Sequence, residues 1–228
     1  MKNLIKSEIY KIKFEKCIWI ILILILFVSL NNFGLQTSSN GKEAFCSSTR
    51  DFVTLFACAA YAGMSIAYDF SNRTINNLII SGHNRLKVLL SKLVRYYLGC
   101  IIIYFSSTII ITLPYLLTKG WGNEFDFDEL NYIILYITLT LFFTISTSTI
   151  MFFIAFFIKE TGLATTLCLF TMLVIILSIK DTQFSSITLT DDILTGNKTF
   201  FYGMVWGLIQ IIIPLILSFI HFRKVELK

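Results

Sequence analysis

Long apolar segments separated by short polar ones dominate the pattern of this chain. Six segments lack Asp, Glu, Lys and Arg and come close to the roughly 20 residues that a helix needs to cross a bilayer: 17–35, 52–68, 96–117, 131–158, 163–179 and 200–222. A continuously apolar run such as Ile18–Val28 does not fit the alternating pattern of a barrel strand. We therefore predict an all-α integral membrane protein, with six spans in a single transmembrane domain over residues 1–228.

Composition and charge distribution support this fold and predict its orientation. Of the 228 residues, 56% are hydrophobic and 14% are charged, whereas soluble domains carry about 25% charged residues. The polar segments on the N-terminal side of the spans hold 14 Lys and Arg and five acidic residues, while those on the other side hold five and nine. The positive-inside rule therefore places both termini in the cytoplasm of a multi-pass plasma-membrane protein.

The N-terminal segment, residues 1–16, combines apolar residues near one helical face with several lysines. This pattern is typical of an amphipathic helix that lies on an anionic membrane surface. A basic flank that only sets the topology explains the pattern equally well.

The stretch 69–95, between the second and third spans, predicts a short cytoplasmic helix. Ser71 or Asn72 is its candidate N-cap and Gly82 its candidate left-handed end. Ile75, Leu78 and Ile79 form an apolar stripe with i, i+3, i+4 spacing. This stripe needs a cover, supplied either by the chain's own helix ends or by a cytoplasmic partner. A second amphipathic segment follows, whose leucines are expected to face away from four basic residues: Arg85, Lys87, Lys92 and Arg95.

Within the predicted spans the sequence indicates helix packing rather than chemistry. No ionisable Asp, Glu, Lys or Arg lies there, which argues against a proton relay or ion site, and the Ser and Thr residues are expected to serve helix contacts. Ala59 and Gly63 form a small-xxx-small pair, and Pro114 and Pro214 are expected to kink the third and sixth spans. The semi-apolar loop 180–199 is a candidate for entry into the outer leaflet.

No catalytic or cofactor motif is present in the sequence. A phosphate-binding loop needs Gly-x-x-x-x-Gly-Lys-[Ser/Thr], and the nearest approach, Gly34 followed by Gly41-Lys42, has the wrong spacing. The five cysteines predict no disulfide framework, and His83 and His221 stand apart, which predicts no metal site. The chain is therefore expected not to be an enzyme.

Two stretches carry a resemblance to a known family. They are the basic amphipathic start, residues 3–13, and the motif from Asp69 through Arg73 and Thr74 to Leu78-Ile79, followed by Asn84-Arg85 and Ser91-Lys92-Leu93. Together with six spans and internal termini, they resemble the permeases of the ABC type-2 transporter class. The chain is most similar in pattern to the small bacterial permeases of bacitracin and lantibiotic resistance, or immunity, systems.

The resemblance implies a cytoplasmic ATP-binding subunit as partner, with ATP and Mg bound there and no cofactor in this chain. It implies that residues 71–81 form a coupling helix in which Ile75, Leu78 and Ile79 contact that subunit, while Asp69, Arg73 and Thr74 fix the loop. A second permease copy or paralogue and membrane lipid are the other expected partners.

The sequence therefore predicts a permease subunit of an ATP-driven exporter that expels an antimicrobial peptide or a hydrophobic compound. The alternative is a non-transporting structural or sensory membrane subunit that docks a cytoplasmic partner through loop 69–95. No nucleic-acid partner is expected.

Overall fold

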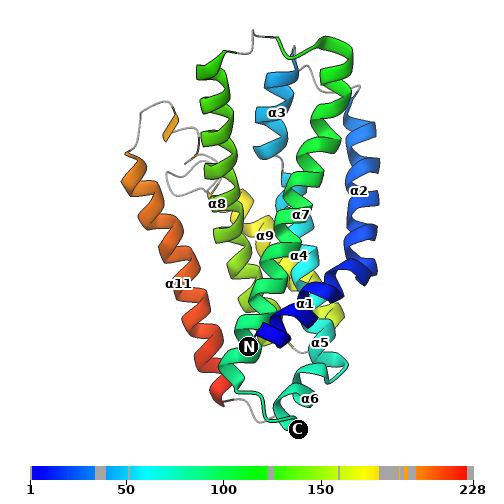
Figure 1. Cartoon of the computed structure of the whole chain (residues 1–228), viewed down its shortest axis with the longest axis vertical. Helices are drawn as coiled ribbons and strands as arrows, with labels where there is room; N and C mark the ends of the chain where they lie inside the picture. The colour runs from blue at the N-terminus through cyan, green and yellow to red at the C-terminus, as the bar shows by residue number, and fades with distance from the viewer. Residues whose placement is uncertain are drawn as a thin grey trace.

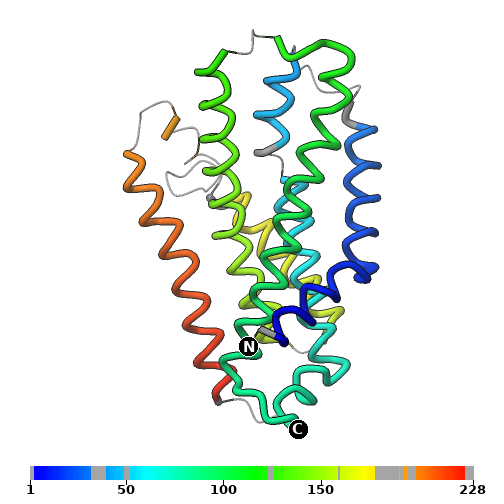
Figure 2. The backbone as a smooth tube through the Cα atoms, in the orientation of Figure 1, coloured from blue at the N-terminus to red at the C-terminus, as the bar shows by residue number. Residues whose placement is uncertain are grey.

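The computed structural model describes residues 2–33, 40–50, 52–122, 126–158, 160–179, 190, 193–194 and 199–224. Within these ranges the chain forms helices and no strand, as the apolar pattern predicted. Most helices run along the long axis of the molecule (Figures 1 and 2). The loop 180–199 lies almost entirely outside the described residues.

The N-terminal half of the chain begins with a short helix, α1 (Lys2–Phe14), followed by α2 (Lys16–Phe33). The second predicted span is a composite of α4 (Phe52–Ala62), a π turn η1 (Gly63–Ala67) and α5 (Tyr68–Ser71), and α3 (Gly41–Arg50) precedes it. The short helix α6 (Thr74–Ile80) follows.

Four longer helices form the rest of the structure: α7 (Arg85–Lys119), α8 (Phe127–Phe157), α9 (Thr161–Ile179) and α11 (Phe200–Lys224). The third predicted span, residues 96–117, lies within α7, and the basic segment 85–95 that was expected to lead into it forms the first three turns of the same helix. The fourth predicted span likewise starts four residues early, at Phe127. Hydropathy marks the apolar part of a helix, whereas backbone hydrogen bonding carries the helix into polar sequence.

Four helical runs in the described residues are long and apolar enough to cross a membrane: Gly41–Ser71, Arg85–Lys119, Phe127–Phe157 and Phe200–Arg223. Two further apolar helical segments, Lys16–Asn31 and Thr161–Leu177, are shorter. The protein is therefore a multi-pass membrane protein, and the count of six spans stays a prediction.

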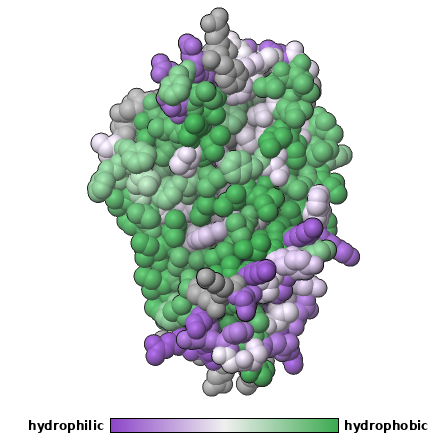
Figure 3. All heavy atoms as spheres, in the orientation of Figure 1, coloured by the Kyte–Doolittle hydropathy of each residue, from purple (hydrophilic) through white to green (hydrophobic). Residues whose placement is uncertain are grey.

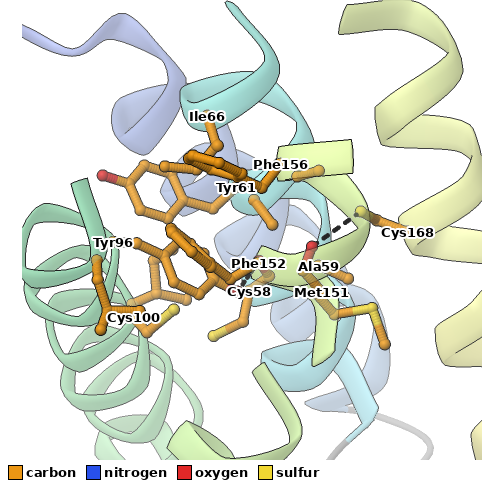
Figure 4. Close-up of a cluster of buried hydrophobic side chains, with 14 of the residues drawn as sticks. Cys58, Ala59, Tyr61, Ile66, Tyr96, Cys100, Met151, Phe152, Phe156 and Cys168 are labelled. Carbon is orange, nitrogen blue, oxygen red and sulfur yellow. Dashed lines mark hydrogen bonds between the residues drawn. The ribbon is translucent and has the colours of Figure 1, made fainter. Parts of the chain in front are cut away.

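The core lies where α4 packs against α2, α7, α8 and α9. Figure 4 shows its centre, where small residues such as Cys58 and Ala59 lie among large aromatic side chains. The hydroxyl of Tyr96 donates to the carbonyls of Cys58 at 3.2 Å and Ser148 at 3.1 Å, which joins α7 to α4 and α8. All five cysteines are free, in agreement with the prediction of no disulfide.

Several buried Ser and Thr residues bond to their own helices or to neighbouring ones. On α8, Thr144 and Ser148 donate to carbonyls four residues earlier, while Tyr97 and Thr149 join α7 to α8 at 2.8 Å. Thr54 of α4 and Ser107 of α7 are 2.9 Å apart. These contacts agree with the packing role expected from the sequence.

The two ends of the bundle differ from its middle in surface character. An apolar belt covers the central part of the view in Figure 3, and hydrophilic side chains gather at both ends. The helices α1, α5 and α6 and the C-terminal end of α11 lie together at one end (Figure 1). This end collects the segments that the charge distribution assigned to a single side of the membrane.

Candidate functional site: a buried ion network beside a short exposed helix

Charged side chains from three helices meet inside the end of the bundle that holds α1 and α6. Glu8 projects from α1, Asp69 from α5, and Lys92 and Arg95 from α7. All four are buried, and Lys92 has no exposed surface. Lys92 and Arg95 are three residues apart, so they share one face of α7, and Glu8 follows the buried Leu4 by four residues on the inner face of α1.

The four groups form a closed set of ion pairs. Lys92 Nζ lies 2.8 Å from Glu8 Oε1 and 2.6 Å from Asp69 Oδ2. Arg95 Nη1 lies 2.9 Å from Glu8 Oε2, and its Nη2 lies 2.8 Å from Asp69 Oδ2. Two carboxylates therefore face two cations in a nearly dry site, where unpaired charge is costly.

A second set of contacts surrounds Arg95. Its Nη2 donates to the carbonyl of Ser65 in the π turn at 2.9 Å, and its Nε lies 3.3 Å from Glu15 Oε1. Glu15 in turn accepts a 2.7 Å hydrogen bond from the hydroxyl of Tyr61 on α4. Arg95 thus connects α7 with the second span and with the α1–α2 junction.

The electrostatics of the site favour ionised Glu8. Burial raises the pKa of this carboxyl, but the charges of Lys92 and Arg95 and the hydrogen bonds from Lys92 and Lys11 outweigh it, so the pKa lies below its ordinary value. Lys11, which is partly exposed, lies 3.0 Å from Glu8 Oε1. Ionised Glu8 pairs with Lys92 and Arg95, and these ion pairs join α1 to α7.

The network continues directly into α6. Thr74 Oγ1 donates to the backbone carbonyl of Asp69 at 2.8 Å and to Asp69 Oδ1 at 3.0 Å. The preceding residue, Arg73, is exposed and holds a left-handed conformation with φ 55°. This left-handed residue lets the chain turn between α5 and α6 within two residues.

The ends of α6 differ in part from the prediction. Ser71 and Asn72 were the expected N-caps, but they end α5, and Arg73 occupies the N-cap position without a side-chain bond. The helix of the second span continues past its apolar part to Ser71, so α6 starts only at Thr74. Gly82 does adopt the expected left-handed conformation, with φ 89°, and His83 N–H bonds to the Leu78 carbonyl as in a Schellman ending.

The apolar stripe of α6 faces the chain's own bundle. Ile75 has no exposed surface, and Leu78 and Ile79 are partly buried against the same core. The outer face instead presents Asn77 and Ile80, and Ile80 is 82% exposed. Of the two covers considered for the stripe, the structure therefore shows the internal one.

The other predicted positions lie inside the helical bundle. Ala59 is fully buried, and a Cβ on Gly63 would lie 2.5 Å from Thr165 Cα of α9, so the two backbones approach closely there. Pro114 and Pro214 lie inside α7 and α11, each of which continues past its proline. The kinks remain a prediction.

The ion network was not predicted from the sequence. Lys92 and Arg95 were expected to lie on the face opposite the leucines, whereas both are buried and Leu86 is 42% exposed. The reason is that Glu8 and Asp69, which lie far away in sequence, compensate them. The available signal was the i, i+3 spacing of two cations directly before an apolar span, together with an acidic residue on the apolar side of α1.

Comparison with known proteins extends over most of the chain. The family described as ABC-2 family transporter protein matches residues 4–177, a range that includes α1, the ion network and α6. No curated protein and no solved structure shows a significant match. In the described residues no group of three or more His, Cys, Asp or Glu is arranged to hold a metal ion.

Proposed function

The chain belongs to the ABC-2 family of transporter proteins and is a membrane component of an ABC transporter, and we propose that it exports an amphipathic antimicrobial peptide or a hydrophobic compound. Family membership implies association with a cytoplasmic ATP-binding subunit. ATP and Mg are then bound by that partner, and this chain supplies the path across the membrane.

The observation that carries the proposal is the way α6 is presented. Its apolar side is anchored in the bundle by Ile75, its start is tied to the ion network through Thr74, and its outer face is exposed. A helix fixed on one side and free on the other can pass a displacement of its partner to the spans behind it. We therefore assign the contact with the ATP-binding subunit to Arg73, Asn77 and Ile80, with Asp69, Thr74, Ile75, Leu78 and Ile79 as positioning residues.

The proposal also covers orientation and assembly. The excess of Lys and Arg in the segments grouped with α1 and α6 favours a cytoplasmic location for both termini, in a bacterial plasma membrane. Only 17% of the apolar part of α11 is buried within the chain. We assign the remaining surface of α11 to membrane lipid and to a second permease copy or paralogue.

The choice of substrate class rests on the sequence resemblance to peptide-resistance permeases. The distribution of polar groups is compatible with it, since the predicted spans carry hydroxyl and amide groups rather than ionisable ones. Spans of this composition offer a substrate mainly apolar contact, which suits an amphipathic or hydrophobic compound more than a small ion.

The test begins with purification of the full-length chain from its native membranes. We expect a vanadate-sensitive ATPase to accompany the wild type and to be lost from Ile80→Asp. The matched control is Asn131→Asp, which adds the same charge at an exposed position of α8, outside α1 and α6. Recovery of no ATPase with the wild type, or equal recovery with Ile80→Asp, would refute the docking assignment.

Transport is tested by expressing the chain with the recovered ATPase in a sensitive bacterial host. We expect increased survival in bacitracin or a lantibiotic, and loss of that survival with Ile80→Asp. Unchanged survival together with an intact, ATP-hydrolysing complex would contradict the substrate class and leave the family assignment in place.

A further inference from the structure

The outer face of α1 has a composition that the ion network does not explain. Its exposed residues include Lys6 and Lys13, together with Ile9, Tyr10 and Phe14, which are 46%, 65% and 62% exposed. The rings of Tyr10 and Phe14 are 5.0 Å apart and form one apolar patch. Exposed aromatic residues beside lysines are unfavourable in water and typical of a helix at a lipid headgroup layer.

The position of α1 agrees with that environment. The helix packs on α7 at the end of the bundle where the apolar belt of Figure 3 gives way to hydrophilic side chains. Lys16, the first residue of α2, is exposed as well. Three cations therefore lie at the border of the belt, where the charge complement is an anionic phospholipid headgroup.

The inner face of α1 reaches α6 through an unbroken series of polar contacts. Glu8 pairs with Lys92 and Arg95, both cations pair with Asp69, and Asp69 accepts the hydroxyl of Thr74 at the start of α6. A change in how firmly α1 is held thus changes the support of the first turn of α6.

We propose that the outer face of α1, formed by Lys6, Ile9, Tyr10, Lys13 and Phe14, is a docking surface for anionic phospholipid, and that its engagement stabilises α6 through the Glu8–Lys92–Arg95–Asp69 network. The lipid surface does not depend on the proposed transport function, because both of its readouts are measured on the chain alone. Its consequence is that the readiness of α6 to bind a partner depends on the surrounding lipid.

Hydrogen–deuterium exchange of the full-length chain tests the proposal. The chain is compared in bilayers of phosphatidylcholine alone and of phosphatidylcholine mixed with phosphatidylglycerol. We expect phosphatidylglycerol to slow amide exchange in residues 2–14 by roughly fivefold for each lysine engaged. Exchange in residues 74–80 is expected to slow as well, by a smaller factor, because the network transmits only part of the stabilisation. Lys6→Gln/Lys13→Gln is expected to remove both effects, whereas Lys87→Gln/Lys119→Gln, which removes equal charge outside α1, is expected to retain them.

Each contrary outcome bears on a definite part of the proposal. Equal protection in Lys6→Gln/Lys13→Gln overturns the docking surface, and so does the same protection produced by inorganic phosphate in phosphatidylcholine bilayers. Protection confined to residues 2–14 overturns transmission to α6. Since the lysines are exposed, their variants are expected to fold, and the unfolding midpoint in phosphatidylcholine verifies this for each one.

Discussion

Replacing Glu8 with Gln is expected to lower the free energy of unfolding by about 3–5 kcal/mol, the cost of breaking a buried ion pair from one side. Glu8 accepts from Lys92 at 2.8 Å, from Arg95 at 2.9 Å and from Lys11 at 3.0 Å. Lys92 and Arg95 are 0% and 2% exposed. Among the described residues, the other carboxylates close to them are Asp69 and, for Arg95, Glu15 at 3.3 Å. The substitution keeps the shape of the side chain and removes its charge.

The pair with Lys11 supplies a matched control. The side chain of Lys11 is 43% exposed, so Lys11→Gln is expected to cost no more than about 1 kcal/mol. In Lys11→Gln, Glu8 loses one partner and keeps Lys92 and Arg95, whereas in Glu8→Gln both buried cations lose a partner.

The assay is equilibrium unfolding of the full-length protein in mild detergent with increasing denaturant, followed by tryptophan fluorescence. A double-mutant cycle with Lys92→Met isolates the pair, because Glu8→Gln/Lys92→Met leaves Asp69 matched with Arg95. We expect a coupling energy of about 2 kcal/mol between the two positions. A loss below about 1 kcal/mol in Glu8→Gln, without measurable coupling to Lys92, would refute the network as a main support of α1.

Three further predictions follow from named contacts. The folded-state pKa of Glu8 lies below its ordinary value of 4.5. The contribution of Glu8 to stability is therefore complete above pH 4.5 and declines as the pH falls through the lower folded-state pKa. We expect the unfolding midpoint to drop in that range, less steeply in Glu8→Gln than in the wild type. Arg73 has φ 55°, a conformation that Asn tolerates better than Arg and that β-branched residues tolerate worst. Arg73→Asn is therefore expected to be at least as stable as the wild type and Arg73→Ile less stable in the same assay. Equal stability of the two variants would contradict a left-handed residue here. A Cβ on Gly63 would lie 2.5 Å from Thr165 Cα, whereas a Cβ on Gly162 would meet nothing within 4 Å. Gly63→Ala is therefore expected to lower the free energy of unfolding by about 1–3 kcal/mol, and Gly162→Ala to leave it nearly unchanged. The reverse order of the two variants would exclude the contact with α9.

The helical membrane fold could be predicted because hydropathy is a property of each segment by itself. Ile18–Val28 is apolar whatever its neighbours are, and the bilayer leaves helix as the way to satisfy its backbone. The same reasoning placed a short helix after the second span and a left-handed Gly82 at its end. Helix boundaries were less accurate, since Arg85 is polar and still helical.

The candidate site was predicted only in part, because burial depends on the partner that covers a residue. Asp69 and Thr74 were singled out from the motif, and the structure brings them together. The stripe headed by Ile75 was identified, but the sequence left its cover undecided, and the bundle supplies it. Ile80, the most exposed apolar residue of α6, belongs to no sequence pattern that would mark it as accessible.

The sequence by itself determined that this chain is a helical membrane protein, which end of it is positive and where the short helix after the second span lies. All three are sums over neighbouring residues, so local sequence is sufficient. Only the tertiary structure decided that Lys92 and Arg95 are buried rather than solvated. Their compensation comes from Glu8 and Asp69, 84 and 23 positions away from Lys92, and the pairing of charges so distant depends on which helices become neighbours.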